Sequence, residues 1–300
     1  MKTGKYIVNG DIRPFVVRHD GQLVDWSALD QDGTPDAVRS AVSRALHDSN
    51  DDAFCAALPA LSRSLISAPS LLERATPLAQ PIEFAPPVRP RNFICIGLNY
   101  RDHAAETALK LPEAPLLFAK TANAINSHDH PVPLPPDSTQ IDYEAELAVV
   151  IGRTCHRVSS NNALSYVAGY TCGNDVSARD FQFGESQWYR GKSADGFGPI
   201  GPWIVTPDEI PDPGTLRIQL RLNGHTMQDS TTANLVFGVA ALIEYISRYI
   251  TMVPGDIILT GTPPGVGFTR KPPVFLKPGD RVEIAIDRIG VLANTIASPR

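Results

Sequence analysis

The chain has 300 residues, of which 43% are hydrophobic and 20% are charged, and its formal net charge at pH 7 is -5. This composition is ordinary for a globular protein with enough chain to bury a core, in one large domain or two unequal ones. The small acidic excess, without a block of like charges, argues against a nucleic-acid-binding protein. No apolar run reaches the roughly 18 residues of a membrane span, and the N-terminus lacks the apolar core of a signal peptide. We therefore expect a cytoplasmic protein without membrane contact.

The four cysteines are scattered along the chain, at Cys55, Cys95, Cys155 and Cys172. None forms a C-x-x-C pair, and no histidine stands at zinc-finger spacing. In a chain of this size, such cysteines indicate buried, reduced thiols.

Residues 1–87 are expected to form a small N-terminal α+β domain. Turn residues Asn9 and Gly10 separate two β-like runs, and a Thr-Pro-Asp sequence is typical of a helix start. The expected elements are strands at 6–8 and 15–17 and helices at 36–47 and 52–58. The segment 80–90 contains four prolines and is expected to be a linker.

Residues 88–300 show short β-like runs between turns and few helices. The expected strands are 93–96, 116–119, 147–151, 204–205, 216–222, 257–260 and 282–286, and the expected helices are 161–167 and 235–249. The regular strand–helix alternation of a doubly wound sheet is missing, and there is no dinucleotide-binding or P-loop motif. We expect a mainly β fold with α-helices (α+β), a sandwich or roll of mixed sheets.

Three acids stand at alternating positions before the apolar run 147–151: Asp142, Glu144 and Glu146. On a strand these side chains would share one face, where like charges repel each other. A bound cation would remove this repulsion, because it needs anionic oxygens that converge from one side. A solvated face of an edge strand is the alternative interpretation.

Asp175 follows another β-like run and can complete an all-oxygen site. Such a site favours Mg²⁺ or Mn²⁺ over Zn²⁺, which prefers histidine and cysteine. Alternatively, Asp175 caps a helix.

His103 and Glu106 would be neighbours on one face if residues 99–106 are helical. A carboxylate beside an imidazole orients it as a general base for water. A surface ion pair on a short helix is the alternative interpretation, and the pattern alone favours it. Lys192 by itself is compatible with an exposed loop lysine.

Five motifs in order resemble the fumarylacetoacetate hydrolase family. They are Gly97-Leu98-Asn99-Tyr100 with His103 and Glu106, the segment 142–146, the segment 174–180, Gly191-Lys192-Ser193, and the segment 259–267. The resemblance extends from about residue 93 to residue 296, which is two-thirds of the chain. The first ninety residues resemble the variable N-terminal domain of the longer bacterial members.

The resemblance implies the β-roll fold of the family, a homodimer, and Glu144, Glu146 and Asp175 as ligands of one Mg²⁺ or Mn²⁺. It implies a water-activating dyad of His103 and Glu106 on a lid. It also implies that Lys192 stabilises negative charge on the substrate oxygen. The residues that match the positions holding the 2-oxo carboxylate are Arg179, Gln182 and Thr262.

The implied activity is hydrolysis of a carbon–carbon bond in a 2,4-dioxo acid, such as fumarylpyruvate or a diketo-deoxy sugar acid, with release of pyruvate. The partner is then a small oxo acid. An oxaloacetate decarboxylase and an isomerase of a 2-hydroxy-dienedioate use the same enolate and stay open. A non-catalytic metal-binding protein is the alternative of another class. Trp188 and the polar segment 227–234 are further candidates for the pocket lining.

Overall fold

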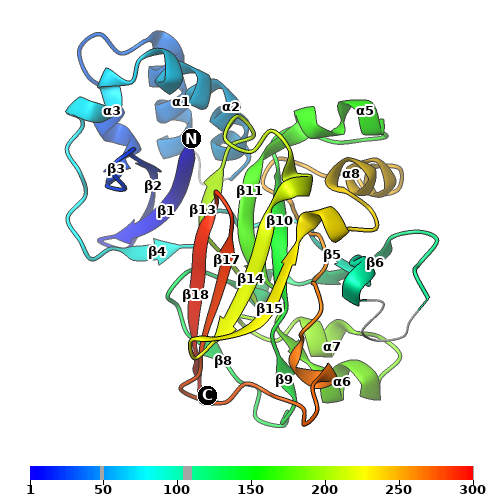
Figure 1. Cartoon of the computed structure of the whole chain (residues 1–300). Coiled ribbons are helices and arrows are strands. Elements are labelled where there is room, and N and C mark those ends of the chain that lie inside the picture. The colour runs from blue at the N-terminus through cyan, green and yellow to red at the C-terminus, as the bar shows by residue number, and fades with distance from the viewer. Residues whose placement is uncertain (48–50, 104–109, 300) are drawn as a thin grey trace.

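The computed structural model describes residues 1–47, 51–103 and 110–299 (Figure 1). Two β-sheets lie face to face, and the N-terminal helices cover the outer face of the larger sheet. The expected fold class, mixed sheets with α-helices, is confirmed.

The larger sheet runs through both parts of the chain. Its strands, in order across the sheet, are β3 (Leu23–Asp25), β2 (Asp11–Val17), β1 (Lys2–Val8), β13 (Gly198–Val205), β11 (Val167–Asn174), β10 (Ala145–Ile151), β16 (Ile257–Leu259), β5 (Phe93–Gly97) and β6 (Leu116–Lys120). Two short strands join it at the side: β4 (Glu83–Ala85) pairs with β1, and β7 (Ile125–Asn126) pairs with β13. Neighbouring strands along the order are antiparallel except β16 and β5.

The second sheet packs against β10, β11 and β13 of the first, and Figure 1 shows its yellow and red strands in front of the green ones. Its order is β15 (His225–Thr231), β14 (Arg217–Leu222), β17 (Arg281–Ile286), β18 (Gly290–Ala297) and β8 (Val132–Pro133). A separate pair is formed by β9 (Ile141–Asp142) and β12 (Ser177–Ala178).

Strand β10 shows how the two layers form. Its side chains alternate between the two faces, as they must in a strand. Leu147 and Val149 join the core between the sheets, whereas Ala148 and Val150 join the core beneath the N-terminal helices. Because both faces are covered, the strand is a nearly continuous apolar run.

The helices surround this sheet pair. Their bounds are α1 (Asp36–His47), α2 (Asp51–Ser67), α3 (Ser70–Arg74), α5 (Ser160–Ala163), α6 (Arg179–Gly184), α7 (Tyr189–Lys192) and α8 (Val239–Ser247). Helix α2 continues to Ser67, nine residues beyond the predicted end, with Pro59 inside it. An internal proline removes one helical hydrogen bond. Here Leu58, Leu61 and Leu65 are buried against the sheet, and this burial offsets the loss.

The N-terminal region shares the large sheet with the rest of the chain, because Lys2 and Thr3 of β1 pair with Val205 and Ile204 of β13. The segment 80–90 is therefore more than the predicted linker, since it contains β4. The boundary at residue 87 stays a prediction.

Two other expectations concern the chain as a whole. The four cysteines are buried free thiols, as predicted. Among the described residues, no helix has the length and apolar character needed to cross a membrane.

Candidate active site

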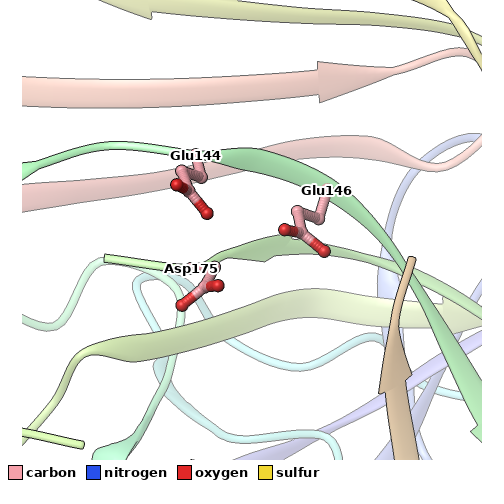
Figure 2. Close-up of side chains that lie close together, drawn as sticks. All are labelled: Glu144, Glu146 and Asp175. Atoms are coloured by element: carbon pink, nitrogen blue, oxygen red, sulfur yellow. The ribbon is translucent and has the colours of Figure 1, made fainter. Parts of the chain in front are cut away.

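Three buried carboxylates converge where two neighbouring strands meet. Glu144 lies in the short link between β9 and β10, Glu146 lies on β10, and Asp175 follows the end of β11. One oxygen from each carboxylate lies within 4.8 Å of the others, and Figure 2 shows the three side chains grouped together. The backbone N–H of Asp175 donates to the carbonyl of Glu144 at 3.0 Å, which holds the two segments in register.

Asp142 does not share this cluster, in contrast to the expected single strand with three acids on one face. The strand is interrupted at residues 143–144. The carboxylate of Asp142 instead accepts hydrogen bonds from the backbone N–H groups of Gly267 (2.7 Å) and Phe268 (3.1 Å). It also accepts one from Nε of Arg179 at 2.9 Å. Asp142 thus orients Arg179 through Nε, and Nη2 of the same guanidinium group stays free to pair with Glu144.

Lys192 lies directly against the carboxylates. Its Nζ donates to Oε2 of Glu144 at 2.9 Å and to Oδ2 of Asp175 at 2.7 Å. The residue ends the short helix α7 and is 1% exposed, so the exposed-loop interpretation is wrong. Arg179 adds a second cation, with Nη2 2.6 Å from Oε1 of Glu144.

Lys120 is a buried cation that the sequence interpretation missed. It ends β6, and its Nζ lies 2.7 Å from Oδ1 of Asp175. The same Nζ donates to the carbonyls of Val176 (2.9 Å) and Lys192 (2.5 Å). A lysine at the end of the apolar run 116–119 was the available signal. Lys120 therefore ties Asp175 and the backbone of Lys192 to the end of β6.

The charges of this cluster do not balance. Asp142 adds a fourth carboxylate beside it through Arg179. Within the described residues, four carboxylates (Asp142, Glu144, Glu146 and Asp175) then face three cations (Lys120, Arg179 and Lys192). If every group carried its usual charge, one negative charge would be in excess in a buried place. An all-oxygen set with excess negative charge fits a hard divalent cation.

The excess affects the two glutamates differently. Burial alone would raise the pKa of Glu144, but Lys192 and Arg179 outweigh it and hold this pKa at about 2. Burial raises the pKa of Glu146 well above its usual range, and the nearby charges of Asp175 and Glu144 raise it further. The backbone N–H of Gly261 donates to Glu146 at 2.6 Å and opposes this rise only in part.

A cavity of about 310 Å³ opens over the carboxylates. Seven of the nine predicted site residues line it, namely His103, Glu144, Glu146, Arg179, Gln182, Lys192 and Thr262. Asp175 lies in the carboxylate cluster itself. Glu106 lies outside the described residues, so the predicted dyad stays a prediction.

His103 is held at the cavity by its neighbour Asp102. Residues 101–103 are helical, and His103 is 7% exposed. The carboxylate of Asp102 accepts from the backbone N–H of His103 at 3.1 Å. Its other oxygen accepts from Ser230 (2.5 Å) and Asn234 (2.9 Å). These bonds fix the start of this helix to the polar segment 227–234.

The predicted carboxylate-binding residues form two supported groups. Nη1 of Arg179 donates to Oε1 of Gln182 at 2.9 Å within α6. Thr262 accepts from Nε2 of Gln228 at 2.8 Å, and Oε1 of Gln228 accepts from the backbone N–H of Ala145 at 2.9 Å. Gln228 belongs to the polar segment 227–234, and it joins the Thr262 loop to the start of β10.

Comparison with known proteins identifies the class. Residues 92–297 match the family described as "Fumarylacetoacetate (FAA) hydrolase C-terminal", which is more than half of the chain. The chain therefore belongs to the fumarylacetoacetate hydrolase family, and it is an enzyme of that family.

Several named relatives share long stretches of sequence with it. The protein titled "Oxaloacetate tautomerase FAHD2A, mitochondrial" from Bos taurus is 48% identical over 214 residues, which cover 71% of this chain and 68% of that protein. An uncharacterized protein from Archaeoglobus fulgidus is 49% identical over 214 residues, covering 71% and 82% of the two chains.

Solved structures resemble the whole chain, including its N-terminal region. The fumarylacetoacetate hydrolase from psychrophilic Exiguobacterium antarcticum is 34% identical with a TM-score of 0.79, and 99% of each chain is covered. The maleylpyruvate hydrolase from Sphingobium sp. SYK-6 is 31% identical with a TM-score of 0.76, covering 99% of this chain and 100% of the other. The 2-hydroxyhepta-2,4-diene-1,7-dioate isomerase from Mycobacterium marinum is 32% identical with a TM-score of 0.73, covering 99% and 98%.

Proposed function

We propose that this protein is a divalent-metal-dependent enzyme that stabilises the enolate of a small 2-oxo acid, and that it hydrolyses a carbon–carbon bond of a 2,4-dioxo acid. One observation carries this proposal. The Nζ of Lys192 lies at 2.7–2.9 Å from two carboxylates that can hold the cation, at the edge of a cavity. A cation and an ammonium group beside each other suit a substrate oxygen that gains negative charge.

Glu144, Glu146 and Asp175 would hold the ion, with Mg²⁺ or Mn²⁺ as the expected choices. When bound, the cation supplies Lewis-acid polarisation of the 2-oxo group. Lys192 adds a fixed positive charge to the same oxygen, and its burial strengthens this interaction. Lys120 holds Lys192 and Asp175 in place through the contacts described above.

Arg179, Gln182 and Thr262 would bind the carboxylate of the 2-oxo acid. The guanidinium group of Arg179 pairs with carboxylates through charge-assisted hydrogen bonds. Asp142 fixes the orientation of Arg179 from the opposite side. This binding would place the reacting bond above Lys192 and close to His103.

In the hydrolysis, the dyad of His103 and Glu106 would take a proton from water as its oxygen attacks the carbonyl carbon at position 4. The new carbon–oxygen bond forms, and the bond between carbons 3 and 4 breaks. The electron pair of that bond goes to the pyruvate enolate, which then takes a proton at carbon 3. The products are pyruvate and a carboxylic acid.

Tautomerisation or isomerisation of a 2-oxo acid is the second candidate. The relative titled as an oxaloacetate tautomerase is 48% identical, and this similarity favours it. Such a reaction moves a proton at carbon 3 and needs no attacking water. Oxaloacetate decarboxylation likewise needs the enolate and no water.

The test is a panel of acetylpyruvate, fumarylpyruvate and oxaloacetate, each with Mg²⁺, with Mn²⁺ and with EDTA. Pyruvate release and the ultraviolet absorbance of the enol are followed together. Metal-dependent pyruvate release from the dioxo acids supports hydrolysis. A change in oxaloacetate enol without pyruvate would move the assignment to tautomerase. If the enzyme is a hydrolase, the substitution Glu106→Gln is expected to abolish pyruvate release from the dioxo acids.

The homodimer and the cytoplasmic location stay proposals. Light scattering on the purified protein tests the first. The bovine relative is titled mitochondrial, so microscopy of a tagged chain in its own cells is the direct test of the second.

A further inference from the structure

The cavity has a charged floor and aromatic walls. Phe118 and Trp188 form one wall, with ring centroids 5.2 Å apart at an interplanar angle of 70°. Phe183 and Phe268 form another, with ring centroids 5.5 Å apart. Further apolar lining comes from Ile96 and Leu98.

These walls begin immediately beside the charged groups. The Nζ of Lys192 lies 4.9 Å from the ring centroid of Phe118. The guanidinium carbon of Arg179 lies 4.4 Å from the ring centroid of Phe268. A substrate whose 2-oxo acid end lies on Lys192 and Arg179 therefore places its other end against aromatic rings.

The positive charges of the cavity are already committed to the 2-oxo acid end. In the described part of the chain, Arg179 and Lys192 are the only arginine and lysine side chains that line it. Arg179 also pairs with Asp142 and Glu144, and Lys192 pairs with Glu144 and Asp175. His103 also lines the cavity, and the proposed function uses it as the base for water, which leaves it no role as a partner of the distal group.

The sequence on either side of His103 brings no further cation into the described cavity lining, because Arg101 donates to the carbonyl of Leu235 at 2.7 Å and does not line the cavity. Residues 104–109 read Ala-Ala-Glu-Thr-Ala-Leu and contain no lysine, arginine or histidine. The side chain of Lys110 is 89% exposed and lies 3.5 Å from Glu113. Arg190, near the cavity in sequence, pairs with Glu185 at 2.5 Å and does not line the cavity.

We infer that the substrate group distal to the 2-oxo acid end is apolar, an alkyl or aryl acyl group rather than one that ends in a second carboxylate. This inference rests on the proposed function, because it uses Lys192 and Arg179 as the site of the 2-oxo acid end. It selects acylpyruvates with a hydrocarbon tail among the 2,4-dioxo acids. It also places oxaloacetate, whose other end is a carboxylate, among the poorer substrates.

The energetic reason is the difference between burying a hydrocarbon and burying a charge. Each buried methylene group contributes about 0.8 kcal/mol of favourable free energy. A carboxylate placed against rings, without a partner cation, loses its hydration and gains nothing in return. The selectivity should therefore exceed the roughly tenfold difference that one methylene group in a pocket provides.

Two acids of equal length measure this selectivity. 2,4-Dioxoheptanoate ends in a methyl group, and 2,4-dioxoheptanedioate ends in a carboxylate at the same carbon. Pyruvate release with Mn²⁺ gives kcat/KM for each, and we expect a value at least about tenfold higher for the first. A higher value for the dicarboxylate would overturn the inference and leave hydrolysis itself established.

A variant at the cavity mouth reverses the preference. Phe183 is 60% exposed, so Phe183→Arg is expected to fold and to bring a cation to the distal end. We expect the ratio of kcat/KM to move toward the dicarboxylate by about tenfold or more. Tyr249 is an aromatic residue with 73% exposure that does not line the cavity, so Tyr249→Arg is the matched control and should leave the ratio unchanged. An unchanged ratio in Phe183→Arg would contradict the inference.

Binding separates this inference from the proposed reaction. 2-Oxoheptanoate and 2-oxoheptanedioate have no 4-carbonyl group and cannot be hydrolysed, so calorimetry with Mn²⁺ compares their Kd values without turnover. Tighter binding of 2-oxoheptanoate supports the apolar distal site even if no dioxo acid is hydrolysed, in which case only the proposed reaction fails. Equal or tighter binding of 2-oxoheptanedioate, or no binding of either acid, overturns the inference.

Discussion

Two buried clusters around carboxylates, one in each region of the molecule, differ in how the charge is satisfied. In the N-terminal region, Asp25 accepts hydrogen bonds from Tyr6 at 2.7 Å, from Arg13 at 2.9 Å and from the backbone and side chain of Ser27. In the catalytic region, three carboxylates converge below a cavity, and together with Asp142 they outnumber the neighbouring cations Lys120, Arg179 and Lys192 by one.

This difference indicates a separate role for each cluster. Protein groups satisfy both oxygens of Asp25, so this cluster joins β1, β2 and β3 and stabilises the fold. The carboxylates below the cavity are satisfied only in part, because Glu146 receives little compensation for its burial. The charges of such an arrangement are fully compensated only when a cation from outside the chain binds. The following predictions test this contrast.

The largest effect is expected at Lys120. Lys120→Met removes one partner of a fully buried ion pair and leaves Asp175 without it. We expect the free energy of unfolding of the metal-free protein to fall by about 3–5 kcal/mol, measured by urea denaturation. Lys271 is exposed, so Lys271→Met is the control and should change stability by less than about 0.5 kcal/mol. Equal effects of the two substitutions would refute the role of Lys120.

The next effect concerns catalysis. Lys192→Met removes the ammonium group that faces the substrate oxygen, and we expect kcat to fall about 10²–10³-fold. Lys192→Arg keeps the charge in a different shape and should lose less activity. A Mn²⁺ titration checks that both variants still load the ion. A kcat near that of the parent in Lys192→Met would exclude the proposed role.

In the N-terminal cluster, Asp25→Ala should lower the free energy of unfolding by about 1–3 kcal/mol, because Tyr6 and Arg13 lose their buried acceptor. The kcat of the folded variant should stay unchanged, since this cluster does not line the cavity. Thermal unfolding and steady-state kinetics on the same preparation make the comparison. A large loss of kcat would show that the two regions are coupled.

The same cluster predicts a pH dependence. Burial alone would raise the pKa of Asp25, but hydrogen bonds from Ser27 and Tyr6, with the charge of Arg13, outweigh it and leave this pKa below its ordinary value of 3.8. A lowered pKa contributes stability that is present above pH 3.8 and is lost as the pH falls through the folded-state pKa. Asp25→Asn should therefore flatten the acid side of the stability curve. An unchanged acid slope would contradict this contribution.

The smallest effect on stability is expected at Glu146. Glu146→Gln removes charge from a cluster with excess negative charge and keeps an oxygen for the Gly261 N–H, so the metal-free protein should lose less than about 1 kcal/mol. Added Mn²⁺ should raise the Tm of the parent and not that of the variant. A loss like that of Asp25→Ala would remove the contrast between the two clusters.

Much of the fold could be predicted from periodicity. Each of the seven strands expected between residues 93 and 286 overlaps a strand of the structure, because apolar runs bounded by turns are typical of buried strands. The polar strand β15 was not expected, and β13 begins six residues before the expected run 204–205. Helix α2 was predicted too short, because a proline such as Pro59 is typical of a helix end. The sequence of the helix does not reveal how much apolar surface it buries against the sheet. Strand β4 was missed because its three residues pair only with a strand nearly eighty positions earlier.

The candidate site was predicted through residue types and family resemblance more than through local structure. Glu144, Glu146 and Asp175 were expected to converge, and the structure brings them within 4.8 Å. Lys120 was missed because a lysine at the end of an apolar run carries no sign of its distant partner Asp175. The position of Asp142 also differed, because hydrogen bonds from the segment after residue 265 hold its carboxylate away from the other three.

The sequence by itself determined the family, the sheet-rich fold class and the candidate site residues other than Lys120, because motif spacing and apolar patterning are local properties of the chain. Only the tertiary structure decided which charges compensate one another and which aromatic rings line the cavity. Phe118 and Trp188 are 70 residues apart in the sequence, and Lys120 and Lys192 are 72 residues apart. Such contacts arise from the pairing of strands distant in sequence, and a buried charge acquires its role only from the partners that this pairing brings to it.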